Sequence, residues 1–323
     1  MLPRFIQSIF SYIDFPLGWV VVLGITLLDT LWMSNTWVKL PSPWPALAFM
    51  LIPFYLKGLY RLLVLANILV SPRIFLFFNR LLLCVEYTVL CSIVLSALCT
   101  LSYLACALNY PAVDQALSLM DQAIGFNWLQ FFHLCHSQPI ETILGFAYTS
   151  LIPQLVFFAL FFSFLYQKDR LYEMFWLLVI TSSILVFISV FLPAAGPATA
   201  LGMESFYDIG AREALSDVAF IRSGVSPDFS THGLGGIVAF PSFHTAAAIL
   251  YIYGFRKSGV LGHIILLLNI VMLFSTPTFG DHYLVDMLAG AAIAILSIIG
   301  IRRYPFYRFS NVNMQTKLLS VME

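Results

Sequence analysis

Long apolar segments constrain this 323-residue chain more than any other feature of its sequence. Segments of about 17–25 apolar residues, bounded by charged or turn-forming residues, are typical of helices that cross a lipid bilayer. The chain contains eight candidates, at residues 15–34, 43–60, 81–106, 142–166, 172–193, 242–256, 260–277 and 282–301. The pattern predicts an all-α polytopic membrane helical bundle with about eight transmembrane helices.

The composition excludes an ordinary soluble domain. Hydrophobic residues make up 60% of the chain and charged residues 10%, with a mean hydropathy of +0.91. Charged residues account for about a quarter of soluble domains. The formal net charge is zero, so bulk electrostatics point to no nucleic-acid partner and to no anionic surface.

The distribution of basic residues predicts the orientation in the membrane. If both termini are cytoplasmic, only Lys39, Arg212 and Arg222 of the 16 Lys and Arg residues fall on the other side. Cytoplasmic segments carry an excess of Lys and Arg, so this orientation is favoured. It places His244 and His282 at the extracytoplasmic ends of the sixth and eighth predicted helices.

We expect three parts along the chain. Residues 1–80 would hold two N-terminal transmembrane helices and an interfacial segment at 62–79, where Pro and Arg interrupt the apolar residues. Residues 81–301 would form the helical core, with six helices and the motifs between 193 and 286. Residues 302–323 would be a cytoplasmic tail.

Two extracytoplasmic segments are long. Residues 107–141 place Val113, Leu117, Met120 and Ile124 on one face of a helix, with acidic residues such as Asp114 and Asp121 off it. We interpret this segment as an interfacial helix, with an amphipathic lid or re-entrant segment as the alternative. Residues 194–241, rich in Gly, Pro, Ser and Asp, lead directly into a histidine motif, which favours a functional loop over disorder.

Two histidines lie where the sixth and eighth apolar segments begin. His244 follows Phe240-Pro241-Ser242-Phe243, and His282 is followed four residues later by Asp286. On a helix, residues four apart share a face and can hydrogen-bond. Ionisable groups inside a membrane segment are costly and are functional-site candidates by default.

These side chains suit phosphoryl transfer. His282 can be the nucleophile, Asp286 can orient its ring, and His244 can protonate the leaving oxygen. Ser242 fits a helix start, whose free N–H groups bind anions, and Gly236 would let the backbone approach a phosphate closely. Two alternatives stay open: a helix-packing hydrogen bond, or a metal site in which His232 or Asp281 supplies a third ligand.

The motifs resemble those of the type-2 phosphatidic acid phosphatase superfamily. Residues 241–244 match its Pro-Ser-Gly-His motif except that Phe243 replaces the glycine, and His282 and Asp286 match its third motif, where Thr276 replaces an arginine. The lysine and Arg-Pro of the first motif have no match, and Gly196-Pro197 lies where that motif belongs. With these differences, the motifs of this chain resemble those of a divergent branch of the superfamily, the one that contains fungal inositol phosphorylceramide synthase.

The resemblance covers about residues 140–301 and implies the same roles for His282, Asp286 and His244. It implies dephosphorylation of a lipid phosphate, or head-group transfer between lipids, with no metal or other cofactor. The substrate would be a phospholipid, sphingolipid or isoprenoid phosphate. The protein would be integral to a bacterial inner membrane or a eukaryotic endomembrane, with the site facing periplasm or lumen.

The missing basic residues leave phosphate neutralisation to other groups. Arg222 and Arg212 are the available extracytoplasmic arginines, and Arg222 is our candidate phosphate ligand, with Ser242, Gly236 and Gly196. The competing functional class is a non-enzymatic transporter or lipid-binding protein that has the fold without turnover.

Overall fold

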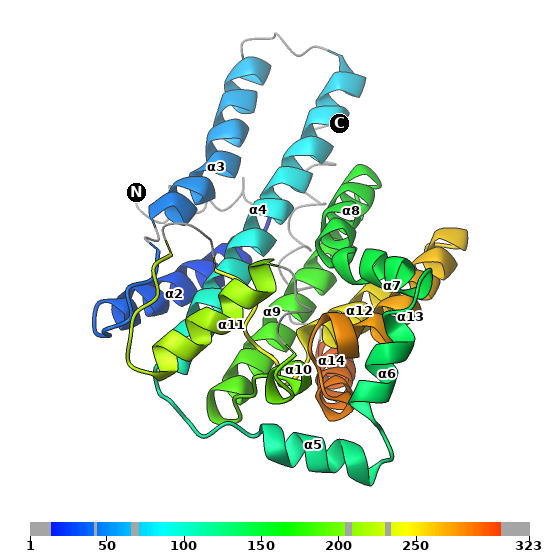
Figure 1. Ribbon diagram of the computed structural model, residues 1–323. Coiled ribbons are helices and arrows are strands. Elements are labelled where there is room, and N and C mark those ends of the chain that lie inside the picture. The colour runs from blue at the N-terminus through cyan, green and yellow to red at the C-terminus, as the bar shows by residue number, and fades with distance from the viewer. Residues whose placement is uncertain (1–13, 42–43, 66–70, 204–208, 230–233, 305–323) are drawn as a thin grey trace.

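The computed structural model describes residues 14–41, 44–65, 71–203, 209–229 and 234–304, and over these residues the secondary structure is helical throughout (Figure 1). The predicted all-α membrane bundle is confirmed. The helices are α2 (Pro16–Met33), α3 (Trp44–Leu65), α4 (Pro72–Cys106), α5 (Asp114–Ala123), α6 (Trp128–Cys135), α7 (Ile140–Thr149), α8 (Leu151–Phe164), α9 (Lys168–Phe191), α10 (Pro197–Ala200), α11 (Ile209–Arg222), α12 (Phe243–Gly254), α13 (Val260–Phe279) and α14 (Leu284–Arg303).

Each of the eight predicted segments is helical, but fewer are long and apolar enough to span a membrane alone. Five helices of the described chain meet that criterion, namely α2, α4, α9, α13 and α14, and the pair α7 and α8, bent by 50°, would be a sixth. With 12 residues, α12 is about 18 Å long, which is less than the roughly 30 Å hydrocarbon core. α3 contains Pro53, Lys57 and Arg61 and is not among the five.

Most of residues 62–79, the predicted interfacial segment, lie within two helices, and their position relative to the membrane stays a prediction. Residues 62–65 end α3, and residues 72–79 are the first turns of α4, which continues without a break to Cys106. Pro72 stands at the start of this helix, where its missing N–H costs nothing, so it begins the helix instead of interrupting it. The boundary that we expected between residues 80 and 81 therefore falls inside α4.

A buried carboxylate joins the N-terminal helices to the rest of the bundle. Glu86 of α4 is 1% exposed and accepts hydrogen bonds from the Phe15 N–H and the Trp19 Nε1 at 3.1 and 3.0 Å. Lys57 of α3 forms an ion pair with the same carboxylate. Because a buried charge without partners is costly, these contacts fix α2 and α3 against α4.

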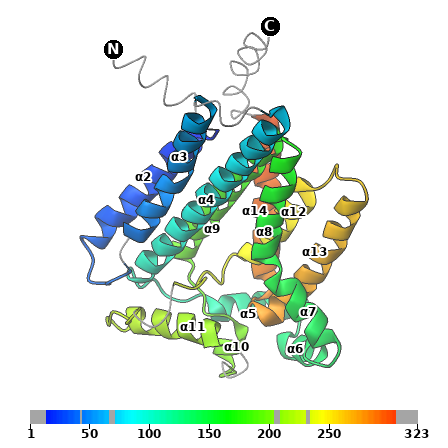
Figure 2. The ribbon, with the colours of Figure 1, turned by 90° about the horizontal axis from the view of Figure 1, so that it is seen from above.

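Short helices gather at one end of the bundle, which we call the α5 end because α5 lies there (Figure 2). The predicted helix in residues 107–141 is present as α5, but its buried face differs from the prediction. Leu117 is buried as expected, whereas Met120 and Ile124 are both 54% exposed and Asp121 is only 3% exposed. Asp121 is buried because its carboxylate accepts two backbone N–H groups of α14.

The orientation of the bundle can be tested by labelling. Ser223, after α11, and Lys257, between α12 and α13, are both exposed, and Figure 2 shows the α12–α13 connection toward the end opposite α11. In a background without the five native cysteines, Ser223→Cys should react with an impermeant thiol reagent added from outside, and Lys257→Cys should react only after permeabilisation. Labelling of both from the same side would contradict this topology.

Candidate active site

The first histidine motif forms the start of α12. Ser242 is the N-cap residue and is fully buried, and its hydroxyl accepts a hydrogen bond from the Thr245 N–H at 3.3 Å. A serine at this position satisfies one of the free N–H groups of the first turn. His244 therefore lies in the first turn of α12, where its ring stacks on Tyr148 of α7 with centroids 4.2 Å apart.

The second motif differs from the expected geometry because His282 is not helical. α14 begins at Leu284, so His282 lies in the preceding turn, where its N–H donates to the Pro277 carbonyl. Asp286 still reaches the histidine: its Oδ2 lies 3.5 Å from His282 Nδ1 and accepts the Tyr283 N–H at 2.9 Å. The 3.5 Å separation is longer than a usual N–H···O hydrogen bond, and catalytic contacts of this kind often tighten when substrate binds.

The backbone holds the two motifs side by side. The Ser242 N–H donates to the Asp286 carbonyl at 3.1 Å, which joins the start of α12 to the first turn of α14. Gly290, one turn further along α14, makes this approach possible, because a Cβ there would lie 2.3 Å from the Ser242 carbonyl oxygen. Any side chain at position 290 would therefore push the two motifs apart.

Carboxylates occupy the N–H groups at the start of α14. Asp121 accepts from the Leu284 and Val285 N–H groups at 2.8 and 3.0 Å, and Asp286 accepts from that of Tyr283. Burial raises the pKa of Asp121, although the two backbone N–H groups act in the opposite direction. The N-terminus of α14 is thus already satisfied within the protein and offers no free donor to an anion.

The start of α12, by contrast, keeps free donors. In the described part of the chain, the backbone N–H groups of Phe243 and His244 have no hydrogen-bond partner, since Ser242 caps only the Thr245 N–H. Helix N-termini with unpaired N–H groups bind phosphate and other anions. These two groups lie beside the His244 side chain.

Both histidines line one large cavity of about 520 Å³. Gly236 lies on the same wall, and the other walls are mostly apolar side chains of α4, α8 and α9. Ser242, Asp286 and Gly196 are not among the lining residues. The structure therefore brings His244, His282 and Gly236 together around one cavity. Ser242 and Asp286 do not line this cavity but are adjacent to the histidines. No Lys or Arg of the described residues lines this cavity.

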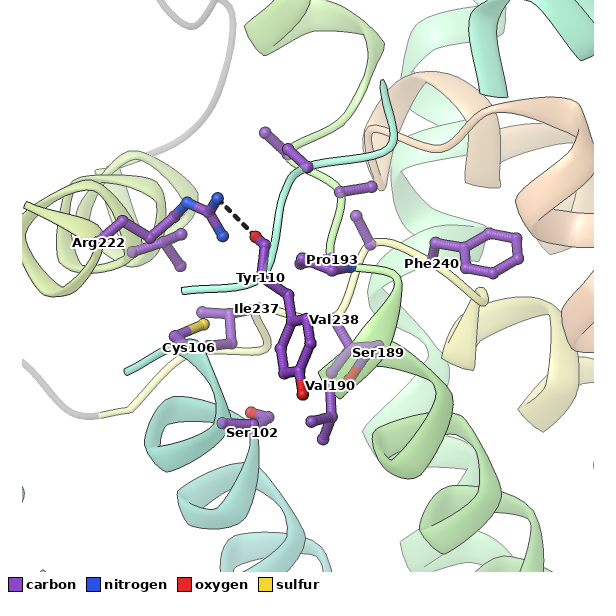
Figure 3. A pocket seen from close by; sticks show the side chains of 16 residues that line it. Ser102, Cys106, Tyr110, Ser189, Val190, Pro193, Arg222, Ile237, Val238 and Phe240 are labelled. Atoms are coloured by element: carbon purple, nitrogen blue, oxygen red, sulfur yellow. Dashed lines mark hydrogen bonds between the residues drawn. The ribbon is translucent and has the colours of Figure 1, made fainter. Parts of the chain in front are cut away.

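Arg222 lies in a different, smaller pocket of about 60 Å³ (Figure 3). Its guanidinium donates to the Tyr110 carbonyl at 2.9 Å, and its own carbonyl accepts from Asn109 at 3.3 Å. Ser102, Ile237 and Val238 line both pockets, so the two pockets are neighbours. The candidate phosphate ligand is therefore placed next to the large cavity and not in it.

Gly196 has a conformational role beside the site. Its φ angle is +106°, and a Cβ would lie 2.1 Å from Asp281 Oδ2. Its N–H donates to Asp114 at 2.9 Å, while Asp281 Oδ1 accepts the Ala198 N–H at 2.7 Å. The loop at Gly196 is thus packed against the turn that carries His282.

The metal alternative involved Asp281 and His232 as third ligands. Asp281 faces the start of α10, and His232 lies outside the described residues. Among the residues that the structure describes, no group of three His, Cys, Asp or Glu side chains is arranged to hold a metal ion.

Sequence reasoning missed four residues that build the site. Asp114 and Asp121 lie off the apolar face of the predicted helix, and the patterns of the apolar segments mark neither Tyr148 nor Gly290. The sequence does carry one indication, the small residues Ala289-Gly290-Ala291-Ala292, which are typical of close helix approach in membranes.

Comparison with known proteins identifies the family of the segment that carries the site. A family model described as the PAP2 superfamily matches residues 115–300, more than half of the chain, and this range contains both histidine motifs, Gly290 and all of α5 except Asp114. No curated protein and no solved structure matches the chain. From the extent of the match, the chain belongs to the PAP2 superfamily, whose members generally hydrolyse phosphate esters.

Proposed function

We propose that this membrane protein is a lipid phosphate phosphatase, or a lipid head-group phosphotransferase, that acts through a phosphohistidine on the extracytoplasmic side. One observation carries the proposal: His244 and His282 line the same cavity, and the rest of that cavity is mainly apolar and enclosed by helices of the membrane bundle. Such a site offers phosphoryl-transfer groups at one end and a lipid-like surface beyond them.

In the first step, His282 attacks the phosphorus atom. Asp286 lies on the Nδ1 side of the ring, so Nε2 is the nitrogen available for attack. The carboxylate favours the tautomer with the proton on Nδ1 and stabilises the charge that develops on the ring. The bond between phosphorus and the ester oxygen breaks, and protonated His244 gives its proton to the departing alkoxide.

In the second step, the phosphohistidine is resolved. Neutral His244 takes a proton from the acceptor, the acceptor oxygen attacks phosphorus, and the bond to His282 Nε2 breaks. With water as acceptor the product is phosphate, and with a lipid hydroxyl the phosphoryl group passes to a second lipid. The similarity of the motifs to the inositol phosphorylceramide synthase branch supports inclusion of the second outcome.

Backbone donors would compensate the phosphate charge in place of the missing motif arginines. The free N–H groups of Phe243 and His244 are directed from the N-terminus of α12, whose dipole favours an anion. Gly236, for which an added Cβ would meet no atom within 4 Å, lines the same cavity. Fixed donors of this kind stabilise transition-state charge without reorganisation.

His282→Ala should abolish turnover, because no other side chain can replace the nucleophile. Asp286→Asn should impair turnover but leave a residual rate, because the imidazole remains and is only poorly oriented. The measurement is release of phosphate or of transferred product from lipid phosphates by purified protein, with acid-labile phosphohistidine trapped in the wild type. His263→Ala, at an exposed histidine of α13, is the matched control and should retain activity. Full activity of His282→Ala would rule out the assignment.

His244→Ala should reduce activity most on substrates with poor leaving groups. A general acid contributes about 10²–10⁴-fold when an alkoxide departs, and much less for an aryl oxide, which needs little protonation. The rates on an alkyl phosphate and on phenyl phosphate should therefore separate in the variant. Equal losses on the two substrates would instead assign His244 to phosphate binding.

Activity should survive chelators, because the nucleophile, the acid and the N–H donors form a site without a cation. Purified protein is treated with EDTA, dialysed and assayed on the same lipid phosphate, with a zinc-dependent phosphatase treated in parallel as the control. Loss of activity that a divalent metal restores would favour the alternative in which His282 and Asp286 are metal ligands.

A further inference from the structure

The cavity extends far beyond the histidines along α4. Near its mouth, the Cys99 thiol donates to the Gly235 carbonyl at 3.1 Å. At its far end the lining residue is Tyr87, twelve positions earlier on the helix. At about 1.5 Å per residue, these two residues are roughly 18 Å apart along the helix axis. The cavity is therefore a slot that runs from the site into the hydrocarbon layer.

The walls of this slot are suited to an alkyl chain. α8 contributes Leu151, Ile152, Leu155, Val156 and Ala159, and α9 contributes Leu185 and Val186. The α4 wall carries the hydroxyl groups of Thr88, Ser92, Ser96 and Ser102. Such hydroxyls can turn back to carbonyls of their own helix, as that of Ser102 does to the Cys99 carbonyl. Ser182 of α9 also lines the slot, and its hydroxyl is buried without a hydrogen-bond partner in the described chain.

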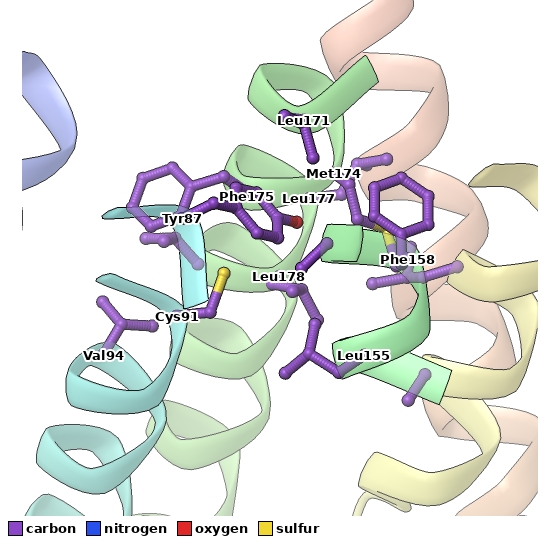
Figure 4. Packing of buried hydrophobic residues seen from close by; sticks show 14 of the residues in the cluster. Tyr87, Cys91, Val94, Leu155, Phe158, Leu171, Met174, Phe175, Leu177 and Leu178 are labelled. Carbon is purple, nitrogen blue, oxygen red and sulfur yellow. The ribbon is translucent and has the colours of Figure 1, made fainter. Parts of the chain in front are cut away.

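Tyr87, at the far end of the slot, is packed among aromatic residues, and Figure 4 shows Tyr87 and Phe158 among the buried side chains of the bundle core. Tyr87 is fully buried and its ring lies 6.4 Å from that of Phe158. Ala159, the next residue of α8, is 2% exposed and is the deepest lining residue of that helix. The Phe15 ring also packs against Tyr87, with ring centroids 5.7 Å apart. A chain that reaches Tyr87 and Ala159 can go no further without disturbing the core.

We propose that this slot holds a hydrocarbon chain of the phosphate-bearing substrate, and that its floor at Tyr87 and Ala159 sets the longest chain that binds fully. The inference rests on the proposed function and adds the length of the substrate's chain. The slot extends about 18 Å along α4 from Cys99 to Tyr87, so a chain longer than this distance would meet the floor.

The test is a series of n-alkyl phosphates of increasing chain length, with phenyl phosphate as the substrate without a chain. In the wild type, kcat/KM should rise by up to about fourfold for each added methylene until the slot is full, the factor that corresponds to about 0.8 kcal/mol per buried methylene. Ser92→Phe should block the slot roughly 10 Å below Cys99, because Ser92 lies seven residues from it on α4.

For each substrate, kcat/KM of Ser92→Phe is divided by kcat/KM of the wild type. Partitioning of a substrate into detergent affects both proteins equally and cancels in this ratio. The ratio should stay within about twofold for phenyl phosphate and fall at least tenfold for the longest alkyl phosphates. Ala292→Phe, which adds the same ring at an exposed position of α14, should leave the ratio flat at all lengths. A flat ratio for Ser92→Phe would overturn the slot, whereas absence of turnover on every phosphate, phenyl phosphate included, would overturn the proposed function.

If Ser92→Phe fails to fold, a binding measurement on the wild-type protein tests the slot instead. A long alkyl phosphate with a diazirine at the chain end is photolysed with the purified protein, and labelled peptides are identified by mass spectrometry. Labels should concentrate around Tyr87 on α4 and Ala159 on α8, and excess unlabelled alkyl phosphate should compete them away. Labels confined to lipid-exposed residues such as Leu296 of α14 would contradict the slot.

Discussion

The close contact between the starts of α12 and α14 is the constraint on which the site depends. His244 and His282 are 38 positions apart in the chain, and α13 lies between them. Their motifs meet because the Ser242 N–H bonds to the Asp286 carbonyl and because Gly290 leaves no Cβ in the way. The relative position of the two candidate catalytic histidines is therefore set by backbone contact, and the two imidazoles need no direct bond to each other.

Polar groups near the membrane need hydrogen-bond partners, and this requirement determines how the segments at the α5 end pack against one another. Asp121 and Asp114 of α5 bond to backbone N–H groups of α14 and of the Gly196 loop, and Asp281 bonds to α10. Each carboxylate joins segments that are far apart in sequence. α5 thus acts as a clamp across the turns that carry the catalytic motifs, although its sequence resembles a simple interfacial helix.

The helical regions and both motifs could be predicted because they depend on local properties. Apolar length fixes where helices form, and the Pro-Ser and His-to-Asp spacings mark where two of them begin. The burial of Asp121, the role of Gly290 and the slot beneath His244 depend on which helices meet, and periodicity within one segment does not contain that information. Pro72 was expected to interrupt the apolar segment, but it begins α4. Sequence alone does not distinguish the two cases, because a proline can stand at the first position of a helix as well as end one.

On the proposed function, the distribution of N–H donors accounts for how a cavity that no described arginine lines would bind a phosphate dianion. At the start of α14, the carboxylates of Asp121 and Asp286 accept the backbone N–H groups. These two acidic side chains would repel a phosphate from that helix end. At α12 the cap is a neutral serine, and two N–H groups stay free next to His244. On the proposed function, this difference between the two helix starts would direct the phosphate toward α12 and leave the Asp286 carboxylate free to orient His282. This division of roles follows from which residue caps each helix.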